Sequence, residues 1–413
     1  MSLGQPPYAA YLGLMTRITT DILISGGGVA GLTAAAAFGS AGFSVICVDP
    51  EPPVTSANAA DADLRSTAFL QPAIAVLDAA GLWAKLGPHA APLQIMRIID
   101  AGGEANEPRR IKDFNASDVS DHGFGYNLPN WLLRREMVAR LAELPNVDFR
   151  PGTATKSVLT RQTEARIGLS DGTAVSAKLL IGADGRNSMV RAALGITVRT
   201  WRYGQKALSF AVSHPIPHDN VSTEIHRSGG PFTLVPLPDR DGMPASAVVW
   251  MTTGAEVQRL AALDTAEFEA AINARSCHIL GPLTLAAPRM VWPIISQLAG
   301  SLTGERTALM AEAAHVTPPI GAQGLNMSLT DIASLLDLAS TSPATLGDAA
   351  MLAAYERARH RDIQTRVFAI DALNRASMLG APALRDLRGA ALDALYAVTP
   401  LRKTLMRAGL GVR

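Results

Sequence analysis

Residues 21–31 read Asp-Ile-Leu-Ile-Ser-Gly-Gly-Gly-Val-Ala-Gly, and this stretch decides the fold of the first part of the chain. An apolar strand runs into a glycine turn, and an alanine-rich segment with the character of a helix follows. A second apolar strand then ends on Asp49, roughly 20 residues beyond the turn. This order of strand, turn, helix, strand and acid is typical of units that bind an adenine dinucleotide.

The glycines and the acid have separate physical tasks in such a unit. Gly26 permits the tight turn, Gly28 lets a pyrophosphate approach the backbone, and Gly31 lets helix and strand pack closely. The helix N-terminus offers N–H groups to the phosphates, and the acid can accept hydrogen bonds from a ribose. The predicted contacts are Gly26, Gly28, Val29, Ala30, Gly31 and Asp49. The motif alone leaves FAD and NAD open, and the alternative is a glycine turn in another α/β unit.

The composition is that of a globular protein with more than one domain. Its 413 residues exceed the size at which a single hydrophobic core stops growing, so we expect two domains. Lys and Arg number 37 against 36 Asp and Glu, and the net charge of +1 offers no bulk attraction for nucleic acid. Cys47 and Cys277 lack metal-ligand spacing, which indicates a reducing compartment without structural disulfides.

The sequence predicts neither a membrane span nor a secretion signal. It contains no uninterrupted run of 18 apolar residues, and residues 1–20 lack the charged segment that begins a signal peptide. We therefore expect a cytoplasmic protein. The native start stays open, because Met15 is an alternative first residue and residues 1–14 precede the first expected strand.

The order of strands and helices predicts a discontinuous two-domain architecture. Helical spacing runs over residues 71–86, and the Asp171-Gly172 pair between alternating segments predicts a hairpin. Beyond residue 200, strands without intervening helices predict a largely antiparallel sheet; they cover residues 207–214, 221–227, 232–236 and 246–252. We assign residues 17–86, 126–200 and 290–347 to the dinucleotide-binding domain, residues 87–125 and 201–289 to a substrate domain, and residues 348–413 to a C-terminal helical region.

A second motif, Ile181-Gly-Ala-Asp184-Gly-Arg-Asn-Ser188, follows a buried strand. Asp184 is expected at the carboxyl end of that strand, where open α/β sheets bind their ligands. Ser188 is expected near the N-cap of a helix. The alternative is a plain Asp-Gly turn.

A third motif runs from Leu309 to Asn326 and combines an acid, a proline-rich turn and glycines. A strand delivers Glu312, and Pro318-Pro319-Ile-Gly321-Ala-Gln-Gly324-Leu325-Asn326 then opens another helix. The N-terminus of that helix is suited to partial negative charge on a ring, such as the N1/C2 carbonyl edge of a flavin.

The three motifs, in this order, resemble the FAD-dependent aromatic hydroxylases of the para-hydroxybenzoate hydroxylase fold. More narrowly, the chain resembles the ubiquinone-biosynthesis hydroxylases of the Ubi type. The narrower likeness covers nearly all of the chain after residue 18 and rests on Asp63-Leu-Arg65-Ser-Thr-Ala, Trp201-x-Tyr203-Gly-Gln205-x-Ala207, Pro318–Asn326, Asp371-x-Leu-Asn374-Arg375 and Pro400–Leu410. It implies an α/β fold: a Rossmann-like FAD-binding domain, an inserted, mostly antiparallel β substrate domain and a C-terminal helical tail.

The resemblance also implies roles for single residues. Arg65 matches an arginine near the pyrophosphate, Arg134 one near the adenosine, and Asp184 an aspartate that contacts FAD and influences NAD(P)H use. The loop beside the isoalloxazine ring is represented by Pro319, Gly321, Gly324, Leu325 and Asn326.

One position departs from the family pattern. The third motif usually reads Gly-Asp, whereas this chain has Ala311-Glu312. Glu312 keeps the acceptor with one more methylene, so contact with the ribitol of FAD remains the expectation.

The implied activity is hydroxylation of the aromatic ring of a (poly)prenylated phenol in ubiquinone biosynthesis. FAD, NAD(P)H as co-substrate, and O₂ would act through a flavin C4a-hydroperoxide. Alternatives are a halogenase or prenyl reductase of the same fold, or a non-catalytic subunit of a quinone-synthesis complex. No catalytic residue and no metal site is predicted, and the ring carbon, the prenyl length and the oligomeric state stay open.

Several further side chains carry weaker signals. His315 is interpreted as a structural residue, and the imidazoles of His214, His218 and His226 are expected to face solvent. Four aromatic residues either line a cavity over the flavin or pack in the sheet: Trp201, Tyr203, Phe232 and Trp250.

The C-terminal tail is basic and amphipathic. Its cations are Arg385, Arg388, Arg402, Lys403, Arg407 and Arg413, and its apolar face comprises Leu384, Leu387, Ala391, Leu392 and Leu395. Such a tail can lie on an anionic membrane or contact a quinone-synthesis complex. The alternative is a helix packed on its own domain.

Overall fold

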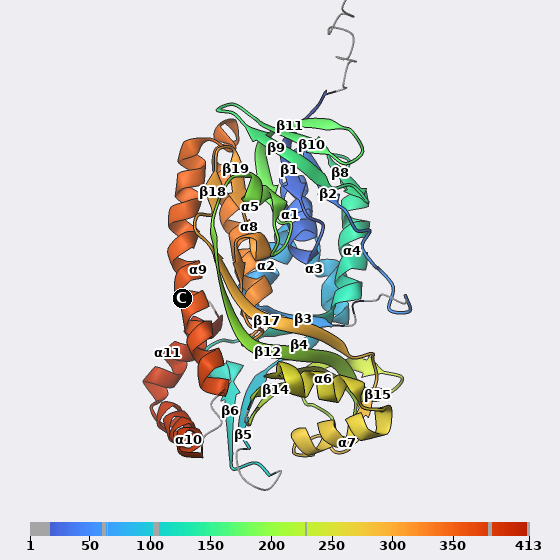
Figure 1. The fold of residues 1–413 in the computed structure, drawn as a ribbon, viewed down its shortest axis with the longest axis vertical. Coiled ribbons are helices and arrows are strands. Elements are labelled where there is room, and N and C mark those ends of the chain that lie inside the picture. The colour runs from blue at the N-terminus through green and yellow to red at the C-terminus, as the bar shows by residue number, and fades with distance from the viewer. Residues whose placement is uncertain are drawn as a thin grey trace, which may run out of the picture.

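The computed structural model describes residues 17–59, 63, 65–101, 107–227, 229–378 and 382–410. Figure 1 shows one sheet with its helices in the upper half and a second sheet in the lower half. The question of the native start, with residues 1–14 and Met15, lies outside the described residues.

The first sheet has eight strands in the order β18-β19-β11-β1-β2-β8, with β10 and β9 added beside β11. They are β1 (Arg17–Ser25), β2 (Val45–Asp49), β8 (Val147–Pro151), β9 (Thr155–Thr160), β10 (Ala165–Leu169), β11 (Ala174–Gly182), β18 (Thr303–Gly304) and β19 (Thr307–Leu309). β1 runs parallel to β2 and β11, and β19 runs parallel to β11. The carboxyl ends of these strands therefore meet at one edge of the sheet, and the predicted α/β class is confirmed.

Helices cover this sheet and bury a single apolar core. They are α1 (Val29–Ser40), α2 (Gln71–Ala79), α3 (Trp83–Leu86), α4 (Asn130–Ala142), α5 (Met189–Ala193), α8 (Gln323–Thr341) and α9 (Ala349–Met378). The alanines of α1 are buried on every face, because their small side chains let the helix pack between the sheet and its neighbours α4 and α8. The single helix expected over residues 71–86 is wrong: Gly81, with φ +69°, interrupts it.

The second sheet has nine strands in the order β20-β17-β12-β15-β14-β13-β5-β6, with β16 beside β12. They are β5 (Ile95–Asp100), β6 (Arg110–Asn115), β12 (Val198–Ser213), β13 (Val221–Arg227), β14 (Gly230–Arg240), β15 (Met243–Thr253), β16 (Thr284–Leu285), β17 (Met290–Ala299) and β20 (His315–Val316). The sheet is largely antiparallel, as predicted, although β13 and β5 pair in parallel. α6 (Gly254–Ala262) and α7 (Thr265–Arg275) pack on it.

The predicted division into domains stays a prediction. β17 belongs to the second sheet, although the segment 290–347 was assigned with the dinucleotide-binding domain. A small third sheet, β3-β7-β4, connects the two halves through contacts with α8 and β14. Its strands are β3 (Ser66–Leu70), β7 (Gly125–Pro129) and β4 (Ala91–Leu93).

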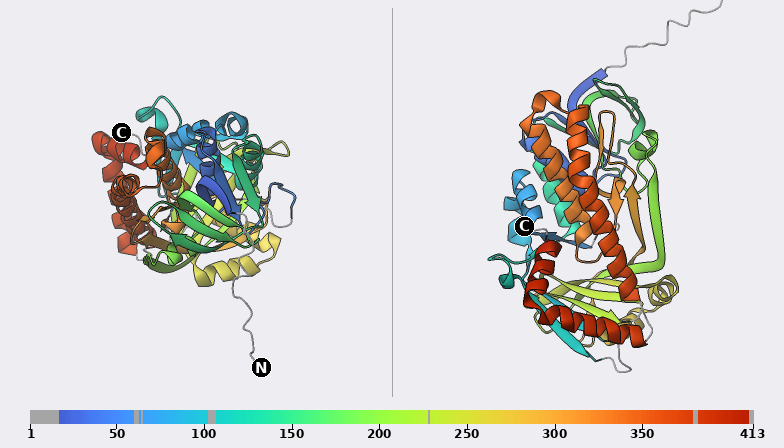
Figure 2. Two further views of the ribbon diagram at one scale, coloured as in Figure 1. Left: turned by 90° about the horizontal axis from the view of Figure 1, so that it is seen from above. Right: turned by 90° about the vertical axis from the view of Figure 1, so that its left-hand side faces the viewer.

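The chain ends in the two helices α10 (Pro382–Ala397) and α11 (Thr399–Leu410), which lie with α9 on one side of the molecule (Figure 2). Leu392 and Leu395 pack against the cluster around Phe114 of β6. Asp393 accepts from Arg110 at 2.8 Å and from Lys112 at 2.9 Å. This part of α10 therefore packs on its own chain. The side chains of Leu384, Arg385, Leu387, Arg388 and Ala391, and residue Arg413, lie outside the described part.

Helix α7 provides a test of the local folding argument. Asp264 caps the helix by accepting from the Glu267 N–H at 2.8 Å, and the Glu267 carboxylate accepts from the Asp264 N–H in return. Replacing Asp264 with Ala is expected to lower the free energy of unfolding by about 1 kcal/mol, measured by urea denaturation. Asp264→Asn is the control, because asparagine caps equally well; an equal loss in both variants would contradict the capping role.

Candidate flavin site and ring cavity

The glycine turn after β1 leaves no room for a side chain at Gly26 and Gly31, where it contacts the rest of the chain, and leaves free space at Gly28, where a ligand would approach. Gly26 has φ +114°, and a Cβ there would lie 2.3 Å from the Ala183 carbonyl oxygen. A Cβ at Gly31 would lie 1.9 Å from the Gly26 carbonyl oxygen, so helix and turn are in direct contact. A Cβ at Gly28 would meet no heavy atom within 4 Å. The three glycines thus have the three properties that a dinucleotide turn requires.

Two carboxylates flank this turn. The Asp49 Oδ2 accepts from the Gly27 N–H at 2.5 Å, which fixes the acid beside the turn. The Asp184 Oδ2 accepts from the Val190 N–H at 3.0 Å, whereas its Oδ1 is buried without a hydrogen-bond partner among the described residues. Ser188 is the N-cap of α5 and accepts from the Arg191 N–H at 2.9 Å, as predicted.

Arg65 and Arg134 are brought together by a buried acid, Asp63. The Arg65 Nη2 lies 2.7 Å and the Arg134 Nη2 3.1 Å from the Asp63 Oδ2. Burial opposes ionisation of Asp63, but the hydrogen bonds and charges of Arg65, Asn130 and Arg134 prevail and lower its pKa. The Arg65 guanidinium also stacks over Trp292, 3.9 Å from the ring centroid. Asp63 is therefore the residue that orients Arg65.

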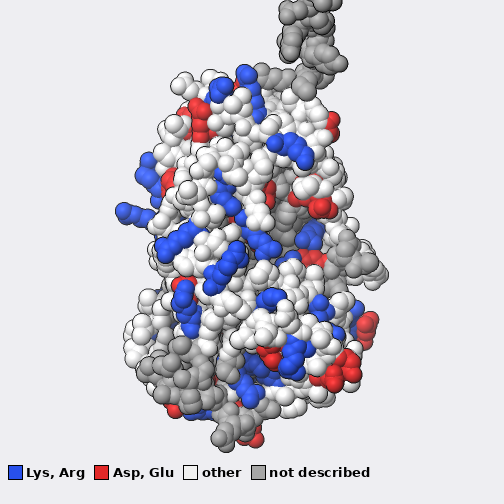
Figure 3. All heavy atoms as spheres, in the orientation of Figure 1, with Lys and Arg blue, Asp and Glu red and all other residues white. Residues whose placement is uncertain are grey.

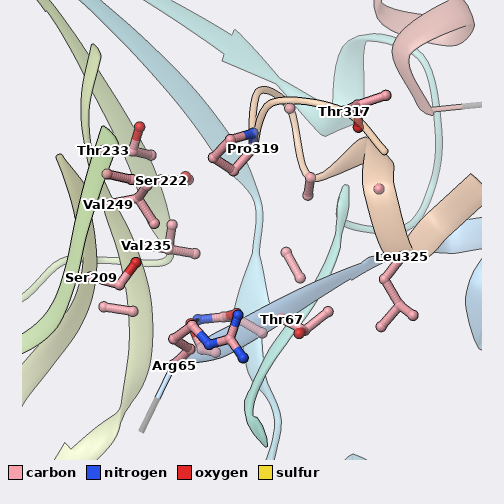
Figure 4. A pocket seen from close by; sticks show the side chains of 18 of the residues that line it. Arg65, Thr67, Ser209, Ser222, Thr233, Val235, Val249, Thr317, Pro319 and Leu325 are labelled. Carbon is pink, nitrogen blue, oxygen red and sulfur yellow. Dashed lines mark hydrogen bonds between the residues drawn. The ribbon is translucent and has the colours of Figure 1, made fainter. Parts of the chain in front are cut away.

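A cavity of about 590 Å³ lies between the second sheet and the loop before α8. In Figure 4, Ser209, Val235 and Val249 point into it from the sheet, opposite Pro319 and Leu325. Six of the predicted cofactor residues line it: Arg65, Glu312, Pro319, Gly321, Gly324 and Leu325. Apolar side chains form most of the wall, and polar or charged residues such as Arg186, Ser222 and Glu224 also line it. A concave, mostly apolar wall with polar groups is the character of a small-molecule site.

Asn326 holds the loop of this cavity against β3. Its Oδ1 accepts from the Leu70 N–H at 2.8 Å, and its Nδ2 donates to the carbonyl oxygens of Ala68 at 2.8 Å and Ala322 at 2.7 Å. The side chain therefore uses both ends of its amide to brace backbone. This role has no signal in the sequence beyond the family motif.

His315 lies behind the cavity as a structural residue. It is 2% exposed, and its Nε2 lies 2.8 Å from the Asp331 Oδ2. Arg359 donates to the other oxygen of Asp331 at 2.8 Å, so the buried carboxylate is paired on both sides. Asp331 also accepts from the Ala311 N–H at 3.3 Å, which positions the turn that carries Glu312.

The four aromatic residues of uncertain role pack within the protein. Phe232 and Trp250 meet edge to face with ring centroids 5.5 Å apart, and Trp201 packs against α9. The Tyr203 hydroxyl donates to an α9 carboxylate at 2.5 Å. Among the described residues, Trp292 is the tryptophan that lines the cavity.

The expectation that His214 faces solvent is wrong. It is 1% exposed, its Nδ1 lies 2.8 Å from the Ile216 carbonyl oxygen, and its Nε2 lies 3.0 Å from the Ser246 hydroxyl. Burial lowers the pKa of His214. Within the described ranges, no group of three His, Cys, Asp or Glu side chains could hold a metal ion.

Comparison with known proteins agrees with the dinucleotide-binding geometry of this site. A family model described as an FAD binding domain matches residues 19–368. The chain belongs to this FAD-binding family. It is 32% identical to the ubiquinone hydroxylase UbiL of Rhodospirillum rubrum over 100% of this chain and 94% of that protein. It is 27% identical to the human mitochondrial ubiquinone biosynthesis monooxygenase COQ6, over 95% of this chain and 93% of that protein.

Solved structures share the fold at lower identity. The p-nitrophenol 4-monooxygenase PnpA of Pseudomonas putida matches with a TM-score of 0.76 at 19% identity, covering 96% of this chain and 99% of that one. PqsL of Pseudomonas aeruginosa, in complex with 2-aminobenzoylacetate, matches with a TM-score of 0.73 at 22% identity, covering 87% and 97%.

The residues present fit the family's FAD cofactor. Space is open at Gly28, and α1 and α8 both begin without a side-chain cap and without an acid in the first turn. Their N–H groups are thus available to phosphates and to a flavin edge. The buried Thr317 Oγ1, beside the α8 loop, also has no hydrogen-bond partner among the described residues. The specific FAD contacts remain predictions.

The open space at Gly28 yields a sharp test. Gly28→Ala is expected to fold normally, because the new methyl meets no protein atom, yet to obstruct the pyrophosphate. The Kd for FAD should rise at least about tenfold, a loss of about 1.4 kcal/mol, in titrations of apoprotein followed by flavin fluorescence.

Gly87→Ala is the matched control for this test. The nearest atom to a Cβ at Gly87 is a Trp83 ring carbon at 3.4 Å, an ordinary van der Waals contact, and the residue lies in the short helix Gly87–His89, outside the β1–α1 turn. Unchanged FAD affinity in Gly28→Ala would show that the cofactor does not approach this turn.

Proposed function

We propose that this chain is an FAD-dependent monooxygenase that hydroxylates the aromatic ring of a prenylated phenol in ubiquinone biosynthesis. One observation carries the proposal: a cavity of about 590 Å³, large enough for an aromatic ring, lies beside the motif loop of a chain that is 32% identical, over its full length, to a ubiquinone hydroxylase. The reaction would consume the phenol, NAD(P)H, a proton and O₂, and would yield the hydroxylated ring, NAD(P)⁺ and water.

The cofactor and the protein divide the work. Bound FAD supplies electrons from NAD(P)H and activates O₂ for transfer to an electron-rich ring. The protein orients the phenol between the second sheet and the α8 loop, where the apolar residues of the wall contact its ring. The uncapped N-terminus of α8 favours negative charge on the flavin edge.

The cofactor contacts that we propose are those of the motifs. The ADP half would be held by Gly26, Gly28, Val29, Ala30, Gly31 and Asp49, with Arg134 near the adenosine. Arg65 would lie near the pyrophosphate, and Asp184 would also contact FAD. The ribitol and ring would be held by Glu312, Pro319, Gly321, Gly324, Leu325 and Asn326. Support comes from the open turn at Gly28, the orphaned oxygen of Asp184 and the position of Glu312 at the cavity.

Accumulated quinone precursors test the function directly. A strain that lacks this gene is expected to accumulate a precursor short of one ring hydroxyl, identified by mass spectrometry. The wild-type chain should restore the product, and a stable Gly28→Ala variant should restore less. A normal quinone profile in the deletion strain would contradict the proposal, and a halogenated or chain-reduced product would identify another flavin chemistry.

We further propose that the protein works in the cytoplasm at the inner face of the membrane, through α11. None of the helices among the described residues is long and apolar enough to span a bilayer. Apolar side chains are exposed on and beside α11: Val398, directly before the helix, is 50% exposed, and Leu401 and Leu405 on α11 are 46% and 44% exposed. Lys403 and Arg407 belong to the same helix. On the face in Figure 3, Lys and Arg side chains spread across the middle, mainly above the place where Figure 1 shows α11. Apolar and basic groups together suit an anionic lipid surface.

Substitution tests this surface better than truncation, because α10 packs on the second sheet. Leu401→Glu is expected to reduce co-sedimentation with anionic vesicles severalfold, because it places a carboxylate in the apolar contact. Leu373→Glu on α9 is the control, since Leu373 is an equally apolar side chain with 58% exposure. Equal binding by both variants and the wild type would exclude α11 as the contact.

A further inference from the structure

A second cavity, of about 240 Å³, adjoins the ring cavity under α11. Four residues line both cavities: Leu70, Met96, Phe124 and Gly321. The second cavity therefore lies directly beside the first, with these four residues between them, on the side of the α8 loop that faces the C-terminal helix.

The wall of this second cavity is mostly apolar. Its further lining residues are Ile98, Phe114, Gln323, Arg402, Leu405, Met406 and Gly409. Among these described residues Arg402 is the charged one. Its Nη1 donates to the Tyr396 carbonyl oxygen at 3.0 Å and its Nη2 lies 3.7 Å from Asp118, while its Nε is buried without a hydrogen-bond partner among the described residues. A ligand in this space would contact carbon on nearly every side, so an apolar ligand is favoured.

The outer end of the cavity opens beside exposed apolar groups. Leu405 lines the cavity and is 44% exposed, and Leu401 is 46% exposed one turn earlier on α11. The Gln323 Nε2 donates to the Gly409 carbonyl oxygen at 3.0 Å, which ties α11 to the α8 loop at this opening. A chain that leaves the cavity would thus pass directly onto an apolar surface.

We infer that this second cavity binds the first part of the isoprenoid chain of a substrate whose ring occupies the ring cavity. The inference rests on the proposed function and adds a binding site to it. The choice of occupant follows from the shared wall with the ring cavity, from the mostly apolar lining and from the exposed apolar side chains along α11. A chain bound there fixes the direction in which the ring enters, so the tail helps to select the ring position that faces the flavin.

Binding by the FAD-loaded, full-length protein tests the inference without turnover. The probes are phenols with zero, one and two isoprene units, in vesicle-free buffer, titrated by the change in flavin absorption. For the wild type, Kd is expected to fall at least about tenfold from zero to two units, because each added methylene is buried. Leu405→Glu should remove most of that gain and leave Kd for the unprenylated phenol within about twofold, because the carboxylate disrupts only the apolar wall.

Thr404→Glu is the matched control, because it adds the same charge to the adjacent, exposed position of α11, outside both cavities. It should retain the full gain from the chain. The inference is overturned if the wild type shows no dependence on chain length, if Leu405→Glu keeps the gain, or if both variants lose it equally. Equally tight binding of a saturated fatty acid would indicate a general lipid cavity instead.

The same samples separate this inference from the proposed function. If the phenols bind with the expected dependence on chain length but none is hydroxylated with NAD(P)H and O₂, the function fails and the chain site stands. If they are hydroxylated with no dependence on chain length or on Leu405, the chain site fails and the function stands.

Discussion

The contact between Gly31 and the carbonyl of Gly26 is the constraint on which the site depends. No Cβ fits there, so α1 begins directly on the turn and its N-terminus points into the open space at Gly28. The same turn meets the second motif, because a Cβ at Gly26 would lie 2.3 Å from the Ala183 carbonyl oxygen. The third motif is joined to the second by a backbone hydrogen bond, in which the Met310 N–H donates to the Gly182 carbonyl oxygen at 3.0 Å. Three motifs far apart in the sequence thus share one sheet edge because their strands are parallel.

The parts of the fold that the sequence could predict are those governed by local rules. Asp171-Gly172 predicts a hairpin, and the structure has antiparallel β10 and β11 with Gly172 at φ +86°. The break at Gly81 was missed, because helical spacing continues across it. The burial of His214 was also missed, as was the contact of Asp63 with Arg65, Asn130 and Arg134. Partners of both residues lie on other elements of the chain, and no periodicity of the sequence indicates them. Pairings of this kind are decided by tertiary packing.

The departure from the family motif has a physical explanation in the turn after β19. Ala311 stands where the motif it resembles has glycine, and it adopts φ +55°, which costs an alanine about 1–2 kcal/mol. Its methyl group is buried, which contributes about 0.8 kcal/mol, and the Asp331 carboxylate accepts from its N–H. Burial therefore offsets part of the backbone cost. Glu312 still lines the ring cavity, which argues for an altered cofactor contact and against a lost one.

The loop from Pro318 to Asn326 lines both cavities and contacts α11, so the C-terminal tail is part of the structure around the ring cavity. Gly321 lines both cavities, Asn326 braces the loop to β3, and Gln323 bonds to Gly409 of α11 and to Arg366 of α9. A displacement of α11 would therefore reach the Pro318–Asn326 loop through a direct hydrogen bond. Removing the tail would disturb the ring cavity together with any membrane contact, whereas single substitutions on α11 keep these effects apart. The helix that would meet the lipid surface is thus also part of the wall around the substrate.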